Sequence, residues 1–180
     1  MKHLYFIRHG QSQMNALGQW GGRSDAPLTQ EGIAQAMVTA KQVAKQGLSF
    51  DVIVSSPLQR AHHTAQQVAK AVQYPIDKII INDVFVERSF GELEGTVNKE
   101  ASEKYYKDEA LIDTYKEVER MVDMQWRAQQ ALDYLNSLPH ETVLVVGHGA
   151  FSRALRRAIN KEPLHERGKT LNNAEIIKLI

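Results

Sequence analysis

Short apolar runs alternate along the chain with longer amphipathic stretches, and this alternation predicts strands separated by helices. The runs that predict strands lie at residues 4–7, 51–54, 78–81, 142–146 and 174–180. They are rich in β-branched and aromatic residues and are bounded by polar residues or glycine, as strands usually are. The run at 4–7 ends on Arg8, His9 and Gly10, so a buried strand stops at a chemically reactive edge.

Apolar residues recur at helical spacing between these runs. The stretches that predict helices are 29–47, 57–72, 118–138 and 151–159. Thr29 suits the N-cap of the first and Gly47 its end, and Pro57 suits the first turn of the second, so that Arg60 projects near the end of a strand. Strands that alternate with helices predict an α/β fold, a three-layer α/β/α domain with a mainly parallel central sheet.

The remaining segments are predicted to surround a site. Residues 16–28 form a glycine-rich loop that can approach a ligand closely, and residues 84–95 form a structured loop that carries Glu87, Glu92 and Glu94. Residues 96–119 are charged and weakly periodic, which indicates a variable lid of helix and loop. We expect residues 1–180 to form one domain.

Composition narrows the class of protein. The 180 residues include 22 basic and 21 acidic side chains, a formal net charge of +1, so the molecule as a whole has no strong attraction to nucleic acid or an anionic membrane. No cysteine is present, which removes disulfides, thiolate nucleophiles and thiolate metal sites. There is no apolar signal segment or membrane-length run. We therefore expect a soluble, cytoplasmic protein with neither a nucleic-acid nor a membrane partner.

Two predicted strands end on a histidine beside glycine, at His9 and at His148. Because the carboxyl ends of parallel strands share one edge of a sheet, His9, His148, Arg8 and Arg60 are expected to converge there. Such a cationic pocket favours a phosphoryl group. A neutral imidazole can attack phosphorus, and the acidic loop around Glu87 can protonate the leaving oxygen.

The chain resembles the histidine phosphatase superfamily, also called the phosphoglycerate mutase-like family. The motifs that carry the resemblance are Arg8-His9-Gly10 with Asn15, Asp25-Ala26-Pro27-Leu28-Thr29 with Gly32, Ser55-Ser56-Pro57-Leu58-Gln59-Arg60-Ala61 with Thr64-Ala65, Glu87 with Phe90-Gly91 and Glu94-Gly95, and Gly147-His148-Gly149. Each is weak alone, but together they are specific, and they occur in the family's order from near residue 4 to near residue 158.

The resemblance implies a phosphoglycerate mutase-like fold and a role for each site residue. His9 would become phosphorylated, while Arg8, Arg60 and His148 hold the phosphoryl group and Glu87 acts as acid and then as base. Asn15, Gly21, Gly22 and Gly149 match substrate-binding positions, although the glycines can equally serve only tight turns. The substrate would be a small phosphomonoester, and neither a metal nor another cofactor is implied.

Within the family the sequence favours a phosphatase over a mutase. We expect a phosphatase of the histidine acid type. Mutases carry paired arginines and a proline-rich segment after the acidic loop, whereas residues 96–119 contain neither arginine nor proline. Gln11 and Ala150 also differ from the mutase pattern. Cofactor-dependent phosphoglycerate mutase is the alternative, and a non-catalytic phosphate-binding protein is the second. The oligomeric state is open, and a homodimer is one candidate.

Other chemistry-bearing residues have plainer interpretations. Glu92 and Glu94 are rivals for the acid, but are expected to be a loop face or structural partners. His62 and His63 lie about 100° apart on a helix and cannot readily share a metal. The remaining predictions are a solvated helix face for Arg153, Arg156 and Arg157, a substrate mouth or packing for Trp20, Tyr105 and Tyr106, and a core or lid-facing position for Met121, Met124 and Trp126.

Overall fold

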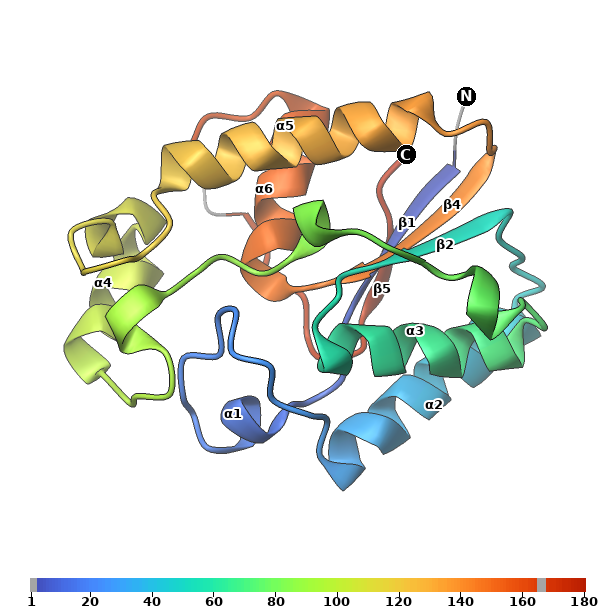
Figure 1. The fold of residues 1–180 in the computed structure, drawn as a ribbon, viewed down its shortest axis with the longest axis horizontal. Helices are drawn as coiled ribbons and strands as arrows, with labels where there is room; N and C mark the ends of the chain where they lie inside the picture. Colours follow the sequence, from blue (N-terminus) through green and yellow to red (C-terminus); the bar gives the residue numbers. More distant parts are fainter. Residues whose placement is uncertain (1–2, 165–167) are drawn as a thin grey trace.

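A five-stranded sheet lies at the centre of the computed structural model, which describes residues 3–164 and 168–180 (Figure 1). The strands are β1 (His3–Arg8), β2 (Val52–Ser55), β3 (Ile80–Ile81), β4 (Thr142–Gly147) and β5 (Ile176–Lys178), and their order is β3-β2-β4-β1-β5. The pairs β3–β2, β2–β4 and β4–β1 are parallel, and β5 is antiparallel to β1. The mainly parallel sheet confirms the predicted α/β class.

Helices cover both faces of the sheet. Helices α2 (Gln30–Lys45) and α3 (Gln59–Ala71) lie on one face, and α5 (Met121–Ser137) and α6 (Gly149–Asn160) lie on the other (Figure 1). Adjacent strand residues point to opposite faces, so that Phe6 packs in the core under α5 and α6 while Ile7 packs in the core under α2 and α3. The predicted three layers are therefore confirmed.

The parallel register brings the ends of three strands together. Arg8 of β1 lies opposite Gly147 of β4, and the His9 N–H donates to the Gly147 carbonyl at 2.9 Å. The Ser56 N–H, just after β2, donates to the Val146 carbonyl at 3.0 Å. Residues that follow three strands thus meet at one edge of the sheet, as the sequence predicted.

Several boundaries differ from the predictions. Pro57 precedes α3 rather than lying in its first turn, because Leu58 is the N-cap and the Gln59 N–H donates to Asp25 at 2.7 Å. Arg60 still lies in the first turn. A 3-10 helix η1 (Ile76–Lys78) occupies part of the predicted third strand, and the left-handed Ala174 precedes a shorter β5.

The segments around the site are short helices and loops. They are α1 (Gln13–Ala16), η2 (Asp83–Phe85), η3 (Gly91–Leu93), α4 (Lys99–Lys107) and η4 (Glu109–Ile112). Helix α4 and η4 lie to one side of the three layers (Figure 1). The mixture of helix and loop predicted for residues 96–119 is confirmed.

The apolar pattern of α5 is only partly buried. Met121 and Met124 belong to the core, but Trp126 is 67% exposed and Val122 is 52% exposed. Two residues correspond to about 200° around a helix, so Trp126 lies away from the face that buries Met124. The prediction that Trp126 faces the core or lid was therefore wrong.

Candidate active site

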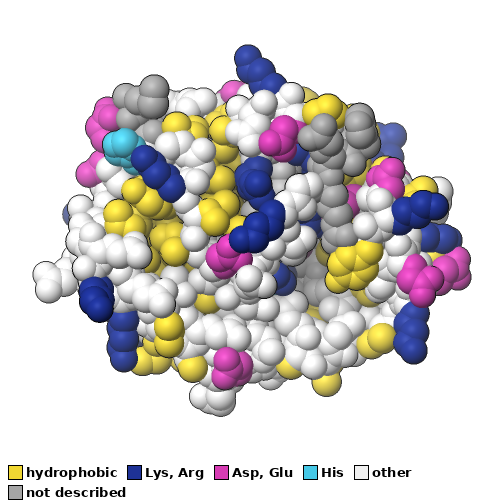
Figure 2. Space-filling model, turned by 180° about the vertical axis from the view of Figure 1, so that it is seen from behind, with side chains coloured by type: hydrophobic (Ala, Val, Ile, Leu, Met, Phe, Trp, Pro, Cys, Tyr) yellow, Lys and Arg dark blue, Asp and Glu magenta, His cyan; other side chains and the backbone are white. Residues whose placement is uncertain are grey.

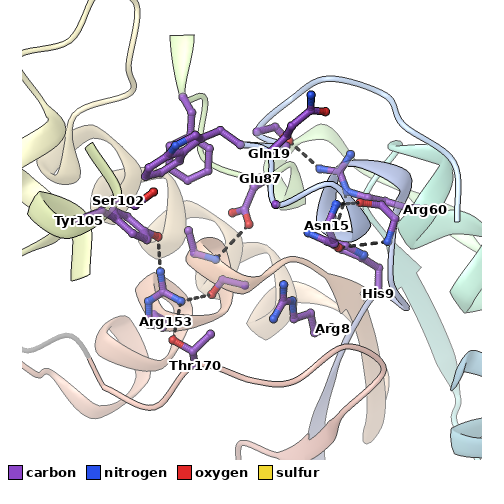
Figure 3. Close-up of a pocket in the computed structure, with 18 of the residues that line it drawn as sticks. Arg8, His9, Asn15, Gln19, Arg60, Glu87, Ser102, Tyr105, Arg153 and Thr170 are labelled. Carbon is purple, nitrogen blue, oxygen red and sulfur yellow. Dashed lines mark hydrogen bonds between the residues drawn. The ribbon is translucent and has the colours of Figure 1, made fainter. Parts of the chain in front are cut away.

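A cavity of about 250 Å³ opens at the carboxyl ends of β1 and β4 (Figure 3). The predicted site residues that line it are Arg8, His9, Asn15, Gly21, Gly22, Arg60, Glu87 and Gly149. His148 is not among the lining residues. The other residues that line the cavity are Ser12, Gly18, Gln19, Trp20, Phe90, Ser102, Tyr105, Tyr106, Ala150, Arg153 and Thr170.

His9 is buried and held in one orientation. Its Nδ1 lies 2.6 Å from the Gly10 carbonyl oxygen, which can only accept, so the proton is on Nδ1 and the lone pair on Nε2. Arg60 Nε donates to this Nε2 at 3.3 Å. Burial, followed by the charges of Arg60 and Arg8, lowers the pKa of His9 well below 6.5. His9 is therefore a neutral imidazole whose unprotonated nitrogen meets the cationic end of the cavity.

His148 lies next to His9 in the same cluster of buried side chains. Its ring is fully buried, and its centroid lies 5.1 Å from that of His9. His148 Nε2 lies 2.8 Å from Ser56 Oγ, and among the described residues Nδ1 has no hydrogen-bond partner. Burial and then the charge of Arg60 lower its pKa well below 6.5. A second neutral imidazole with one unsatisfied nitrogen thus adjoins His9.

Arg8 and Arg60 supply the positive charge. Arg60 donates to the carbonyls of Gly22 and Ser24, both at 2.6 Å, and Arg8 NH1 donates to the Leu171 carbonyl. Arg8 Nε is buried and has no hydrogen-bond partner in the described part of the chain. Burial lowers the pKa of both guanidinium groups. An anion that enters the cavity would offset this desolvation.

The glycine-rich loop is fixed by Glu94, which is the structural partner that the sequence allowed. Its carboxylate accepts from the N–H groups of Arg23, Ser24 and Phe90 at 3.0, 2.9 and 3.0 Å. Gly22 has φ +46°, and a Cβ there would lie 2.0 Å from Glu94 Oε1. Glu92, by contrast, is exposed and accepts from the Lys116 N–H at 2.8 Å.

Asn15 lines the cavity together with His9. It forms a capping box with Ser12 at the start of α1, where the Ser12 N–H donates to Asn15 Oδ1 at 3.1 Å. Asn173 Nδ2 donates to the same oxygen at 3.3 Å and to the His9 carbonyl at 3.2 Å. The Asn15 amide is thus oriented beside the strand that carries His9.

Glu87 binds the N-terminus of α6. Its Oε1 accepts from the N–H groups of Arg88 and Phe151 at 2.8 and 2.9 Å, and Oε2 accepts from that of Ala150 at 3.0 Å. The positive end of the helix dipole favours a carboxylate at this position. Glu87 lies beside the cavity with its acidic group directed to the helix (Figure 3).

Arg127 of α5 holds the strand-like segment that carries Glu87. It donates to the carbonyls of Val84 and Val86 at 2.9 and 2.8 Å, and it forms a bidentate ion pair with Glu119. The sequence does not single out this residue, because a single arginine on an amphipathic helix looks like any solvated position. Only its long-range partners distinguish it.

The arginines of α6 correct a prediction. Arg153 and Arg157 are 3% and 2% exposed, and both pair with Glu109 of η4. The expected solvated face is buried because η4 packs over it, and only Arg156 stays partly exposed. Arg153 also lines the cavity, which adds a third arginine to Arg8 and Arg60.

Aromatic side chains form one wall of the cavity. The ring centroids of Trp20 and Phe90 are 4.7 Å apart, and those of Trp20 and Tyr105 are 5.2 Å apart, all in edge contacts. Tyr106 is 68% exposed at the mouth. These residues both pack against one another and line the opening of the cavity. The two interpretations that the sequence offered, packing and a position at the mouth, are therefore compatible.

Comparison with known proteins establishes the family. The family model described as "Histidine phosphatase superfamily (branch 1)" matches residues 4–180. The chain belongs to the histidine phosphatase superfamily. This confirms the resemblance and the phosphoglycerate mutase-like character of the fold. The match is to branch 1, so the narrower description as a histidine acid-type phosphatase is not supported.

Named members of the superfamily include both mutases and phosphatases. The chain is 32% identical to a 2,3-bisphosphoglycerate-dependent phosphoglycerate mutase of Bartonella bacilliformis, over 84% of this chain and 78% of the relative. It is also 32% identical to the uncharacterized phosphatase PhoE of Bacillus subtilis, over 89% and 78%. The solved structure of Bacillus stearothermophilus YhfR aligns with a TM-score of 0.85 and 26% identity, over 98% of this chain and 89% of that one.

These relatives therefore leave a phosphatase and a mutase as the two activities to distinguish.

None of the helices formed by residues 3–164 and 168–180 is long and apolar enough to cross a membrane.

Proposed function

We propose that this protein is a phosphatase that hydrolyses a small phosphomonoester through a phosphohistidine on His9. The observation that carries the proposal is the state of His9, a buried neutral imidazole with its proton fixed on Nδ1 by Gly10. Its Nε2 lone pair lies where Arg60 meets the cavity. A fixed tautomer beside two arginines is what nucleophilic attack on a phosphoryl group requires.

In the first step His9 Nε2 attacks phosphorus and the ester P–O bond breaks. Arg8, Arg60 and His148 would hold the phosphoryl oxygens, and Arg60 would exchange its bond to His9 for one to the phosphate. Glu87, protonated at this stage, would give its proton to the leaving oxygen.

In the second step water attacks phosphorus and the P–N bond breaks. Glu87, now a carboxylate, would accept the proton of that water, so inorganic phosphate leaves and His9 returns to its neutral form. Asn15 and the backbone at Gly21, Gly22 and Gly149 would contact the substrate, and residues 96–119 would cover it. The position of these residues around one cavity supports these roles.

The test is release of phosphate from an aryl phosphate in the presence of a chelator. We expect wild-type protein to be active and the His9→Ala variant to lose about 10³-fold or more in kcat, since removing a nucleophile removes the main route. Glu94→Gln is the control variant, because Glu94 holds the glycine-rich loop but has no part in the proposed chemistry. It measures how much activity is lost when only the loop is disturbed. Activity that survives His9→Ala would refute the proposal.

Phosphoglycerate mutase is the second candidate, because relatives named as mutases match most of the chain. It predicts that phosphoglycerate isomerises faster than it releases phosphate. The lack of arginine in residues 96–119 argues against it. The two rates measured in one reaction mixture decide between the activities, and dominant phosphate release excludes the mutase.

A further inference from the structure

Glu119, the last residue of the lid segment, carries a carboxylate that the chemistry proposed for His9 does not use. Acidic side chains on the face of the molecule shown in Figure 2 stand out from its surface. The side chain of Glu119, by contrast, is only 11% exposed. Its Oε2 pairs with Arg127 of α5 at 2.8 Å and with Arg23 of the glycine-rich loop at 3.3 Å. One largely buried carboxylate therefore joins α5 to the glycine-rich loop.

The same three side chains hold the segment that carries Glu87. The Glu87 carbonyl accepts from Arg23 Nε at 3.3 Å and from Arg127 NH2 at 3.4 Å. Two residues further on, the Ser89 N–H donates to Glu119 Oε2 at 3.3 Å, and the Ser89 carbonyl accepts from the Glu119 N–H at 3.0 Å. The backbone that follows the acid is thus bound to Glu119 and to both of its arginines.

This anchoring bears on the acid because the Glu87 carboxylate is oriented in part by its own backbone. Its Oε1 accepts from the N–H of the next residue, Arg88, at 2.8 Å and from that of Phe151 at 2.9 Å. Arg88 Nε in turn donates to the Glu119 carbonyl at 2.8 Å. A shift of the peptide between residues 87 and 88 would therefore move the acidic group relative to the N-terminus of α6.

The other side of Glu119 reaches the loop that places Arg60. Arg23 lies between Gly22 and Ser24, whose carbonyls both accept from Arg60 at 2.6 Å. The pairing of Arg23 with Glu119 therefore connects the phosphoryl-binding end of the cavity with the segment that carries the acid. Proton transfer needs both in place at once, because an acid must lie within hydrogen-bond reach of an oxygen whose phosphorus is already held.

We propose that Glu119 is a positioning residue for the acid Glu87 and acts on it through Arg127 and Arg23. The inference rests on the proposed function and adds to it the group that fixes the acid relative to the phosphoryl site. Arg127 is 13% exposed and Arg23 46%, so water competes less for the hydrogen bonds of Arg127. Without the carboxylate that both bind, the two arginines would repel each other and release the Glu87 carbonyl.

The experiment compares phenyl phosphate with 4-nitrophenyl phosphate, whose leaving groups are similar in shape but differ in their need for a proton. Phenolate is the stronger base and depends on the acid, whereas 4-nitrophenolate leaves readily without it. Both esters give the same phosphohistidine, so the value that responds to the leaving group is kcat/KM. We expect the ratio of kcat/KM for phenyl phosphate to that for 4-nitrophenyl phosphate to fall about tenfold or more in Glu119→Gln. An unchanged ratio would overturn the inference.

Three further variants separate positioning from loss of folded structure. Glu92→Gln, the same change at an exposed carboxylate of the acidic loop, should leave both kcat/KM values unaltered. Val68→Ala opens a cavity in the core under α2 and α3, so it should lower stability but not the ratio. Arg23→Gln is the milder variant if Glu119→Gln does not fold, and should lower the ratio about threefold. A ratio that falls equally in Val68→Ala would show that destabilisation alone is the cause.

A double variant shows whether Glu119 acts through the acid. Glu87→Gln should lower the same ratio, and Glu119→Gln added to it should lower the ratio no further, because an acid that has been removed cannot be misplaced. A further fall in the double variant would contradict the inference. Hydrolysis of 4-nitrophenyl phosphate by His9→Ala at the wild-type rate would refute the proposed function, whereas a His9-dependent enzyme whose ratio is insensitive to Glu119→Gln refutes only this inference.

Discussion

His9 and His148 are both buried beside arginines, and this environment keeps them uncharged. Burial is the largest cause of the lowered pKa of each, followed by the charge of Arg60. Each ring therefore loses affinity for protons when the chain folds. For His9 this leaves the lone pair that the proposed chemistry uses. For His148 it leaves Nδ1 without a hydrogen-bond partner among the described residues.

The depressed pKa values predict how stability depends on pH. The unfolded chain binds protons on these histidines near pH 6.5, whereas the folded protein binds them only at much lower pH. Stability is therefore complete above about pH 6.5 and falls as the pH decreases toward the folded pKa values, by up to about 1.4 kcal/mol per pH unit for each histidine.

Urea unfolding from about pH 7.5 to about pH 5.5 measures this slope. The His9→Gln variant should show a slope smaller by one histidine than that of the wild type. An unchanged slope in the variant would contradict the neutral state assigned to His9.

At the scale of elements, the site depends on contacts between loops rather than on the sheet alone. Arg60 binds the carbonyls of the glycine-rich loop, and Glu94 holds that loop from the far side. The left-handed Gly22 is what permits the close approach of Glu94. The position of Arg60 therefore depends on how this loop is held.

Substitution of Gly22 tests this dependence. Gly22→Ala should lower kcat/KM by about tenfold or more, because its Cβ would displace Glu94 and with it the loop that orients Arg60. Gly47→Ala is the matched control, since Gly47 also has a positive φ but a Cβ there meets nothing within 4 Å. Both variants should lose about 1 kcal/mol of stability through backbone strain. Equal kinetic effects in the two would show that the loop does not position Arg60.

The elements also show what the sequence could predict. The strand ends at Arg8 and Gly147 follow from short apolar runs with an abrupt polar stop, and both strands were predicted correctly. The burial of Arg153 depends on Glu109, which comes from a segment with no clear period and lies 44 residues away. No local pattern records such a partner, so the sequence indicated a solvated helix face.

At the scale of the whole molecule, two separate cores support one edge of the sheet. Phe6 and Met124 belong to the core under α5 and α6, and Ile7 and Val68 belong to the core under α2 and α3. The reactive residues lie where both cores end, so the packing of either helix layer supports the site. The three layers were predictable from the alternation of strands and helices and from the helical spacing of apolar residues. The sequence did not show which apolar residues of α5 remain exposed.

Two substitutions on α5 distinguish its buried and exposed sides. Met124→Ala should lower the free energy of unfolding by about 2–5 kcal/mol, because the side chain is fully buried. Trp126→Ala, which removes a larger but mostly exposed side chain, should change it by less than about 0.5 kcal/mol. Chemical denaturation of both variants measures the difference. A larger loss for Trp126→Ala would mean that this face of α5 is covered.

If His9 is the nucleophile, it carries the phosphoryl group during turnover, and this intermediate can be trapped. Protein quenched in base during turnover of a phosphomonoester should carry a phosphoryl group on His9, stable in base and lost in acid, as detected by mass spectrometry of the peptide around His9. The His9→Ala variant should carry none. A wild-type protein that turns over substrate without labelling His9, or a label on another residue, would contradict the account.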